Sequence, residues 1–166
     1  FPQFYSNDSS GRINKEIQLN FEFLNKEESP TVMLFFGYVG CGDICSPALT
    51  ELGRIYERVD KDKSSVYFLN VLDTTKKDTP QPYAKGFHKD FIGIHLDSAG
   101  INNVSDKLNL SIIKVNDQEV SHTGHLFVLR KDYVNKGYTL KYIYTTRPFN
   151  EKAIIADINV LNQTKN

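Results

Sequence analysis

The chain has 166 residues, of which 20 are acidic and 20 are basic, so its formal net charge is zero. This length predicts a single domain, residues 1–166, with a sizeable hydrophobic core. The balanced charge, with no run of one sign, excludes a surface built to bind nucleic acid or anionic lipid. No stretch approaches the ~20 consecutive apolar residues that a membrane-spanning helix needs.

The N-terminal part of the chain predicts a β-hairpin. Phe4-Tyr5 and Ile17-Gln18-Leu19 are short strand-like pieces, and Asn7-Asp8-Ser9-Ser10-Gly11 between them has the composition of a turn. Lys26 to Pro30 is then a polar break before the most apolar part of the sequence.

A buried strand followed by a helix is predicted from Thr31 to Val59. Val32 to Phe36 is a continuous apolar run of the length expected for a strand that is buried on both faces. Gly37 and Gly40 allow a tight turn after it, and Pro47 suits the first turn of a helix, where no amide donor is missed. The helix is indicated by four apolar residues at helical spacing, Leu49, Leu52, Tyr56 and Val59.

Shorter elements follow in the middle of the chain. Val66 to Val71 is a second apolar run, which completes a right-handed βαβ unit with the first strand and helix. A short helix is predicted over Tyr83 to Phe87 and a short strand over Phe91 to Ile94. Ser98 is expected to cap a further helix. Ile112 to Val115 is a brief extended piece.

The C-terminal part predicts a second hairpin and a last helix. Leu126 to Leu129 and Tyr138 to Tyr144 are strands joined by the loop Arg130 to Gly137. Asn150 is expected to cap the last helix. A βαβ unit followed by a hairpin and a helix is the thioredoxin-like order. The sequence therefore predicts an α/β, thioredoxin-like fold with a central mixed β-sheet flanked by helices, preceded by the N-terminal hairpin.

The chain has two cysteines, Cys41 and Cys45, at the predicted junction of strand and helix. Because they are four residues apart, they share one face if this segment is helical. Two thiols held together at a helix N-terminus form either a soft metal site or a redox pair. A structural disulfide and inert buried thiols are the alternatives, and the strand–loop–helix context favours a functional pair.

Four stretches of the sequence, in order, resemble the Sco/SenC family. Residues 35–47, Phe-Phe-Gly-Tyr-Val-Gly-Cys-Gly-Asp-Ile-Cys-Ser-Pro, look like the family's aromatic-Gly-Tyr lead into a Cys-x-x-x-Cys motif. Asp73 with Asp78-Thr79-Pro80 is similar to its acidic and Asp-Thr-Pro segment, and residues 84–93 are similar to its Phe-His-x-x-Phe-Ile-Gly stretch. Val120-Ser121-His122-Thr123, before an apolar strand, resembles its Asp-His-Ser/Thr block.

The resemblance implies a copper-binding, membrane-anchored metallochaperone more than an enzyme. Members of the family bind copper, as Cu(I) or Cu(II), and help to assemble the dinuclear copper centre of cytochrome c oxidase. The implied ligands are Cys41, Cys45 and His122. Asp43 is expected to orient the loop between the cysteines, and Asp78 is expected to cap the short helix.

The same resemblance implies partners and a compartment. The expected partner is the copper-bearing subunit of the oxidase or another copper chaperone. The expected location is outside the cytoplasm: the periplasm, the cell surface or the mitochondrial intermembrane space. Since the chain opens with Phe1-Pro2-Gln3-Phe4, which is no signal peptide, we expect the anchor or signal segment to be missing from this chain.

The sequence departs from the family pattern beside the expected ligands. The family usually has proline after each cysteine, whereas Gly42 and Ser46 stand there and Pro47 follows one place later. The acidic residue that usually precedes the ligand histidine is Ser121. We expect these differences to affect copper affinity more than the fold.

Three classes of function remain open: a copper-binding assembly factor, a thiol–disulfide oxidoreductase using the cysteine pair, and a peroxide-reducing enzyme. Reductases of this fold usually carry Cys-x-x-Cys and a facing proline, but three residues separate these cysteines and Ser121 to Gly124 has no proline. Peroxide-reducing sites need a threonine beside the thiolate, and none closely precedes Cys41. Thiolates and an imidazole suit copper. His88 is interpreted as a packing residue, and His125 as pointing away from the ligand side of its strand.

Overall fold

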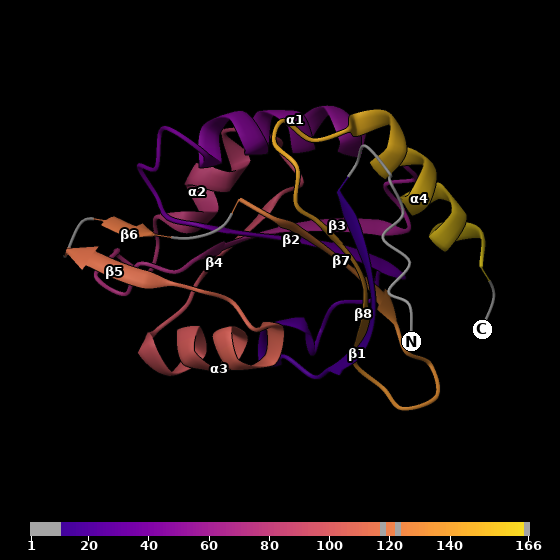
Figure 1. Cartoon of the computed structure of the whole chain (residues 1–166), viewed down its shortest axis with the longest axis horizontal. Coiled ribbons are helices and arrows are strands. Elements are labelled where there is room, and N and C mark those ends of the chain that lie inside the picture. Colours follow the sequence, from indigo (N-terminus) through magenta and orange to yellow (C-terminus); the bar gives the residue numbers. More distant parts are fainter. Residues whose placement is uncertain (1–10, 117–118, 122–123, 165–166) are drawn as a thin grey trace.

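The computed structural model describes residues 11–116, 119–121 and 124–164. Six strands form one sheet and two form a small separate one (Figure 1). The strands are β1 (Arg12–Leu19), β2 (Thr31–Gly37), β3 (Ser64–Asn70), β4 (Ile92–His95), β5 (Ile113–Asn116), β6 (Glu119–Ser121), β7 (Leu126–Lys131) and β8 (Tyr138–Tyr144). The helices are η1 (Glu22–Leu24, 3-10), α1 (Cys45–Glu57), α2 (Pro80–Lys85), α3 (Ser98–Leu108) and α4 (Glu151–Gln163).

The main sheet is built around β2, in the strand order β1-β8-β7-β2-β3-β4. β2 pairs parallel with β3 on one side and antiparallel with β7 on the other. Every residue of β2 is buried, because a strand in the middle of a covered sheet has no solvent-facing side and must be apolar throughout. β7 and β8 are antiparallel neighbours. The predicted parallel pair and the predicted hairpin are therefore both confirmed.

Helices cover the two faces of the sheet unequally. α1, α2 and α4 lie on one face and α3 lies on the other (Figure 1). Side chains that alternate along β2 divide between the two sides: Met33 and Phe35 pack in the cluster that includes α1 and α4, while Val32 and Leu34 pack in the cluster that includes α3. This layered arrangement is the predicted thioredoxin-like α/β fold.

The predicted N-terminal hairpin falls only partly within the described residues. Its second half is β1, which pairs antiparallel with β8 at the edge of the main sheet. Its first half, Phe4-Tyr5, lies outside the described residues. The extended piece predicted at Ile112 to Val115 corresponds to β5, which pairs antiparallel with β6. The sequence did not predict this second strand, so the small sheet is an addition to the expected fold.

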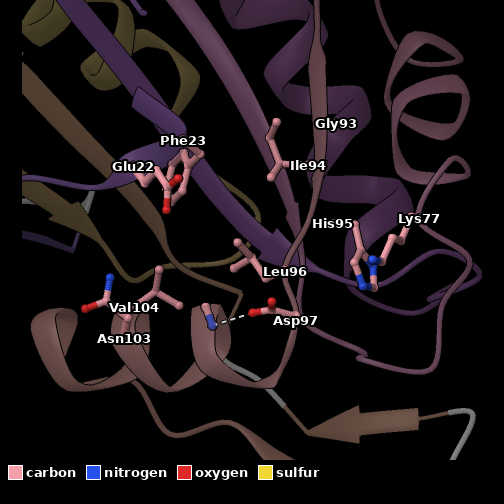
Figure 2. Close-up of a pocket in the computed structure, with 11 residues that line it drawn as sticks. Glu22, Phe23, Lys77, Gly93, Ile94, His95, Leu96, Asp97, Asn103 and Val104 are labelled. Carbon is pink, nitrogen blue, oxygen red and sulfur yellow. Dashed lines mark hydrogen bonds between the residues drawn. The ribbon is translucent and has the colours of Figure 1, made fainter. Parts of the chain in front are cut away.

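One helix cap is confirmed and another is corrected. Asn150 caps α4 as predicted, because its Oδ1 accepts a hydrogen bond from the amide of Ala153 at 3.1 Å. Ser98 does not cap α3. The cap is Asp97, whose Oδ1 accepts a hydrogen bond from the amide of Gly100 at 2.8 Å, and Ser98 is the first residue of the helix (Figure 2). A carboxylate at this position satisfies a free amide of the first turn.

The prediction that Asp78 caps α2 is wrong. The residue before α2 is Thr79, whose side chain makes no capping hydrogen bond, and the helix begins with Pro80. Proline has no amide proton, so this helix start has fewer donors to satisfy. No helix in the described part of the chain is long and apolar enough to cross a membrane.

Candidate metal centre

The two cysteines lie where β2 ends and α1 begins. Cys41 is in the connecting loop and Cys45 is the first residue of α1. Neither forms a disulfide, and they are only 6% and 0% exposed. The Sγ of Cys45 packs directly over Gly37, the last residue of β2, since a Cβ at Gly37 would lie 2.5 Å from that sulfur. The missing side chain therefore makes room for the second thiol.

The loop before the first cysteine is fixed by two backbone amides. The amide of Cys41 donates to the carbonyl of Tyr38 at 3.1 Å, and Gly40 between them has a φ of 93°. This combination is typical of a type II turn, which needs a positive φ at its third residue. The amide of Val39 donates to Oδ1 of the buried Asn70 at 3.1 Å. The loop is thus tied both to itself and to the end of β3.

The residues that depart from the family pattern are accommodated without strain. The hydroxyl of Ser46 donates to the carbonyl of Cys41 at 3.5 Å and closes the loop from the helix side. The same hydroxyl lies beside the phenol of Tyr83. Burial raises the pKa of this phenol, and the serine lowers it by a smaller amount. Gly42 is exposed, and a Cβ there would have no neighbour within 4 Å.

The two thiols are near enough to interact directly. A hydrogen bond with Cys41 and then burial raise the pKa of the Cys45 thiol well above its usual value. The backbone of Tyr38 and the positive charge of Arg147 lower it, but less strongly. In the metal-free chain the thiol of Cys45 is therefore held in the protonated form. A soft metal ion that displaces the protons meets two sulfurs that are already adjacent.

An ion pair lies close to the cysteine loop. Nη1 of Arg147 is 2.6 Å from Oε2 of Glu51, with the two side chains 25% and 10% exposed. The guanidinium carbon of Arg147 lies 4.1 Å from the centre of the Phe149 ring. Gly124, just before β7, packs against the cysteine loop, because a Cβ there would lie 2.7 Å from Cγ2 of Ile44. The segment that enters β7 therefore contacts the residue immediately before the second cysteine.

The histidines separate into different environments. His122 lies outside the described residues. His125 is half-buried and lines a groove on the α3 side of the sheet, where burial lowers the pKa of its imidazole. The cysteines belong to the cluster on the opposite side, so the expectation that His125 points away from them is confirmed. His88 packs edge-on against Tyr56 with ring centres 4.8 Å apart, which confirms its packing role.

Within the described residues, no His, Cys, Asp or Glu completes a group of three or more that could hold a metal ion. Asp43 is exposed. The sequence did not predict that Asn70 and Arg147 contact this region. Asn70 lies 31 residues after its hydrogen-bond partner Val39, and Arg147 lies 96 residues after its partner Glu51. The available signal for Asn70 was a polar residue inside an apolar run, which indicates a buried hydrogen-bonding role.

The strand order and the cysteine pair at the start of α1 define a thioredoxin-like protein with a Cys-x-x-x-Cys motif. Comparison with known families makes this specific. The chain belongs to the SCO1/SenC family, whose family model matches residues 16–160. The resemblance of the four sequence stretches is therefore confirmed.

The chain is similar to proteins from several bacteria. It is 31% identical over 139 residues to an "SCO2-like protein" of Rickettsia felis; the match covers 77% of this chain and 66% of that protein, just under two thirds of its length. Apo Sco1 from Thermus thermophilus has a TM-score of 0.67 and 22% identity, covering 90% of this chain and 92% of that one. Bradyrhizobium japonicum ScoI with copper bound has a TM-score of 0.66 and 21% identity, covering 90% and 99%. The two structures share the fold of this chain.

Proposed function

We propose that this chain is a copper-binding protein of the Sco type, which holds copper through Cys41, Cys45 and His122. The observation that carries the proposal is the pair of buried, reduced thiols, which interact with each other where β2 ends and α1 begins. Thiolates select Cu(I), and an imidazole helps to hold Cu(II). Two sulfurs and one nitrogen therefore suit a metal that changes its oxidation state by one electron. The likeness to a protein solved with copper bound supports the same assignment.

The proposed third ligand rests on chain connectivity. Gly124 fits against Ile44 in the cysteine loop, and His122 precedes Gly124 by two residues. Two residues of chain span at most about 7 Å. The short connection therefore supports an imidazole ligand from position 122 at the cysteine loop.

We infer that copper is cargo and not a permanent cofactor. Three protein ligands leave a coordination position open, through which an acceptor can take the ion. Oxidation of the thiols to a disulfide would remove both soft ligands, so copper load and thiol redox state are coupled. The proposed acceptor is the copper-bearing subunit of cytochrome c oxidase or another copper chaperone. We propose that this role belongs outside the cytoplasm, with the protein anchored to a membrane.

The ligand assignment is tested by the visible absorption of thiolate-to-Cu(II) charge transfer in four variants. Cys41→Ser and Cys45→Ser should lose the band, since each removes a sulfur. His122→Ala should weaken Cu(II) binding far more than Cu(I) binding, because two thiolates still hold Cu(I) in a near-linear geometry. His125→Ala is the matched control on the other face of the sheet and should keep the band. A His122→Ala protein with the wild-type band, or a His125→Ala protein without it, contradicts the assignment.

The contact between the thiols also favours a second candidate, a thiol–disulfide oxidoreductase that reduces the cysteines of a copper acceptor. Cys41 and Cys45 would lose two electrons and two protons together as their disulfide forms, and the acceptor disulfide would gain them. Thiol counting before and after mild reduction tests this candidate. If both thiols stay free in air and unreactive toward alkylating agents, the redox candidate is refuted.

A further inference from the structure

Three parallel strands end side by side below the cysteine loop. Gly37, Asn70 and His95 are the last residues of β2, β3 and β4, and the pairing puts them in one row across the sheet. Residues in one row share a face, and Gly37 faces the sulfur of Cys45. Asn70 and His95 therefore lie on the cysteine side, at the carboxyl ends of the strands, where ligands of α/β sheets bind.

Asn70 uses both ends of its side chain amide. The residue is 0% exposed. Its Oδ1 accepts the amide proton of Val39 at 3.1 Å, and its Nδ2 donates to the carbonyl of Leu72 at 2.9 Å. Val39 lies in the turn that leads to Cys41. One buried side chain thus connects the loop after β2 with the loop after β3.

A longer contact extends this connection to the surface. Nδ1 of His95 lies 3.4 Å from Nδ2 of Asn70. Because β4 is the edge strand of the sheet, His95 also lines a pocket of about 610 Å³ beside α3, together with Lys77 and Asp97 (Figure 2). His95 therefore lies at the outer end of the row.

We propose that Asn70 is a positioning residue, which holds the turn before Cys41 in the geometry that keeps the two thiols together. The copper part of this inference rests on the function proposed above. The thiol part does not, because it concerns the metal-free chain. Losing the hydrogen bond between a buried amide and a loop should shift the equilibrium between the closed and the open loop about tenfold.

The other end of the same strands provides a matched control. Asn162 of α4 is also a buried asparagine, 7% exposed. Its Oδ1 accepts from the hydroxyl of Thr31 at 2.7 Å and its Nδ2 donates to Oγ of Ser64 at 3.0 Å. Thr31 and Ser64 are the first residues of β2 and β3. Replacing Asn162 therefore removes two buried hydrogen bonds from the same strands, far from the thiols.

The first test measures the alkylation rate of the thiols by iodoacetamide in reduced, metal-free protein. Because Cys45 is 0% exposed, it reacts only when the loop opens. Asn70→Ala should raise its rate about tenfold. Asn162→Ala should stay within about twofold of wild type while losing comparable stability. Equal rates for Asn70→Ala and Asn162→Ala would overturn the proposal.

Two further measurements separate the possible failures. If Asn70→Ala does not fold, the exchange rate of the Val39 amide in the wild-type protein decides: protection supports the bond to Asn70, and exchange as fast as in an exposed loop refutes it. In a Cu(I) competition titration, Asn70→Ala should bind about tenfold more weakly than Asn162→Ala. If wild type takes up no copper but the alkylation difference persists, the proposed function fails and the positioning role stands. If copper binds equally to both variants, the positioning role fails.

Discussion

Gly37→Ala should damage the cysteine site more than its small size suggests. The new Cβ would lie 2.5 Å from Sγ of Cys45 and 3.0 Å from Cε2 of Phe68. Both neighbours are 0% exposed, so neither moves freely. Overpacking of this kind costs about 1–3 kcal/mol, while replacing a strand glycine by alanine returns about 0.5–1 kcal/mol. Because a 2.5 Å approach puts the overpacking cost at the upper end of its range, the net loss is about 1–2 kcal/mol. This corresponds to a fall of about 3–6 °C in Tm for a chain of this length.

The assay is a double-mutant cycle read by thermal and urea unfolding of the reduced protein. In a Cys45→Ala background the sulfur is gone, and the Cβ of residue 45 lies 3.6 Å from the new methyl group. The cost of Gly37→Ala should then fall below about 1 kcal/mol. Gly42→Ala in the same loop is the control and should be nearly neutral, since nothing lies within 4 Å of its Cβ. An equal cost of Gly37→Ala in both backgrounds would refute the packing of the thiol on the strand end.

Two further predictions concern charged groups. Arg147→Ala should destabilise the protein by about 2–3 kcal/mol, because it leaves the buried Glu51 without its charged partner. Arg54→Ala removes an exposed ion pair and should cost far less in the same urea titration. Burial alone would raise the pKa of Glu27, but hydrogen bonds from Tyr67 and other donors outweigh it and lower the pKa below the usual 4.5. This carboxylate therefore stabilises the fold above about pH 4.5 and the contribution is lost as the pH falls further. The stability difference between wild type and Glu27→Gln should shrink on acidification, and a constant difference from pH 7 to pH 3 would contradict this.

The sequence predicted the centre of the fold because its signals there are local. The apolar run Val32 to Phe36 and the helical spacing after Pro47 each depend on neighbouring residues, and burial patterns follow directly from such periodicity. The β5–β6 pair was missed because its strands are short and carry little apolar alternation. The dipeptide Asn116-Asp117 has turn chemistry and could have predicted a hairpin here. Asp97 and not Ser98 caps α3. The prediction was off by one residue because both side chains are good caps.

The candidate site was predicted only in part, for a similar reason. Cys41 and Cys45 are close in sequence, so their juxtaposition could be predicted from spacing. Asn70 and Arg147 reach the same loop only because β3 lies beside β2 and the chain returns after β8. Contacts made through strand pairing carry no fixed spacing along the chain. The fold and the thiol pair could therefore be predicted, while the residues that hold the loop required the structure.

The most direct test of the account is an anaerobic Cu(I) titration of the reduced protein, with metal analysis after gel filtration. Wild type should retain one copper ion per chain, and the Cys41→Ser/Cys45→Ser double variant should retain none, because it lacks both soft ligands. Oxidising wild type to the disulfide beforehand should likewise abolish uptake. A wild-type protein that takes up no copper, or a double variant that retains as much as wild type, would contradict the central claim that these two thiols form a copper site.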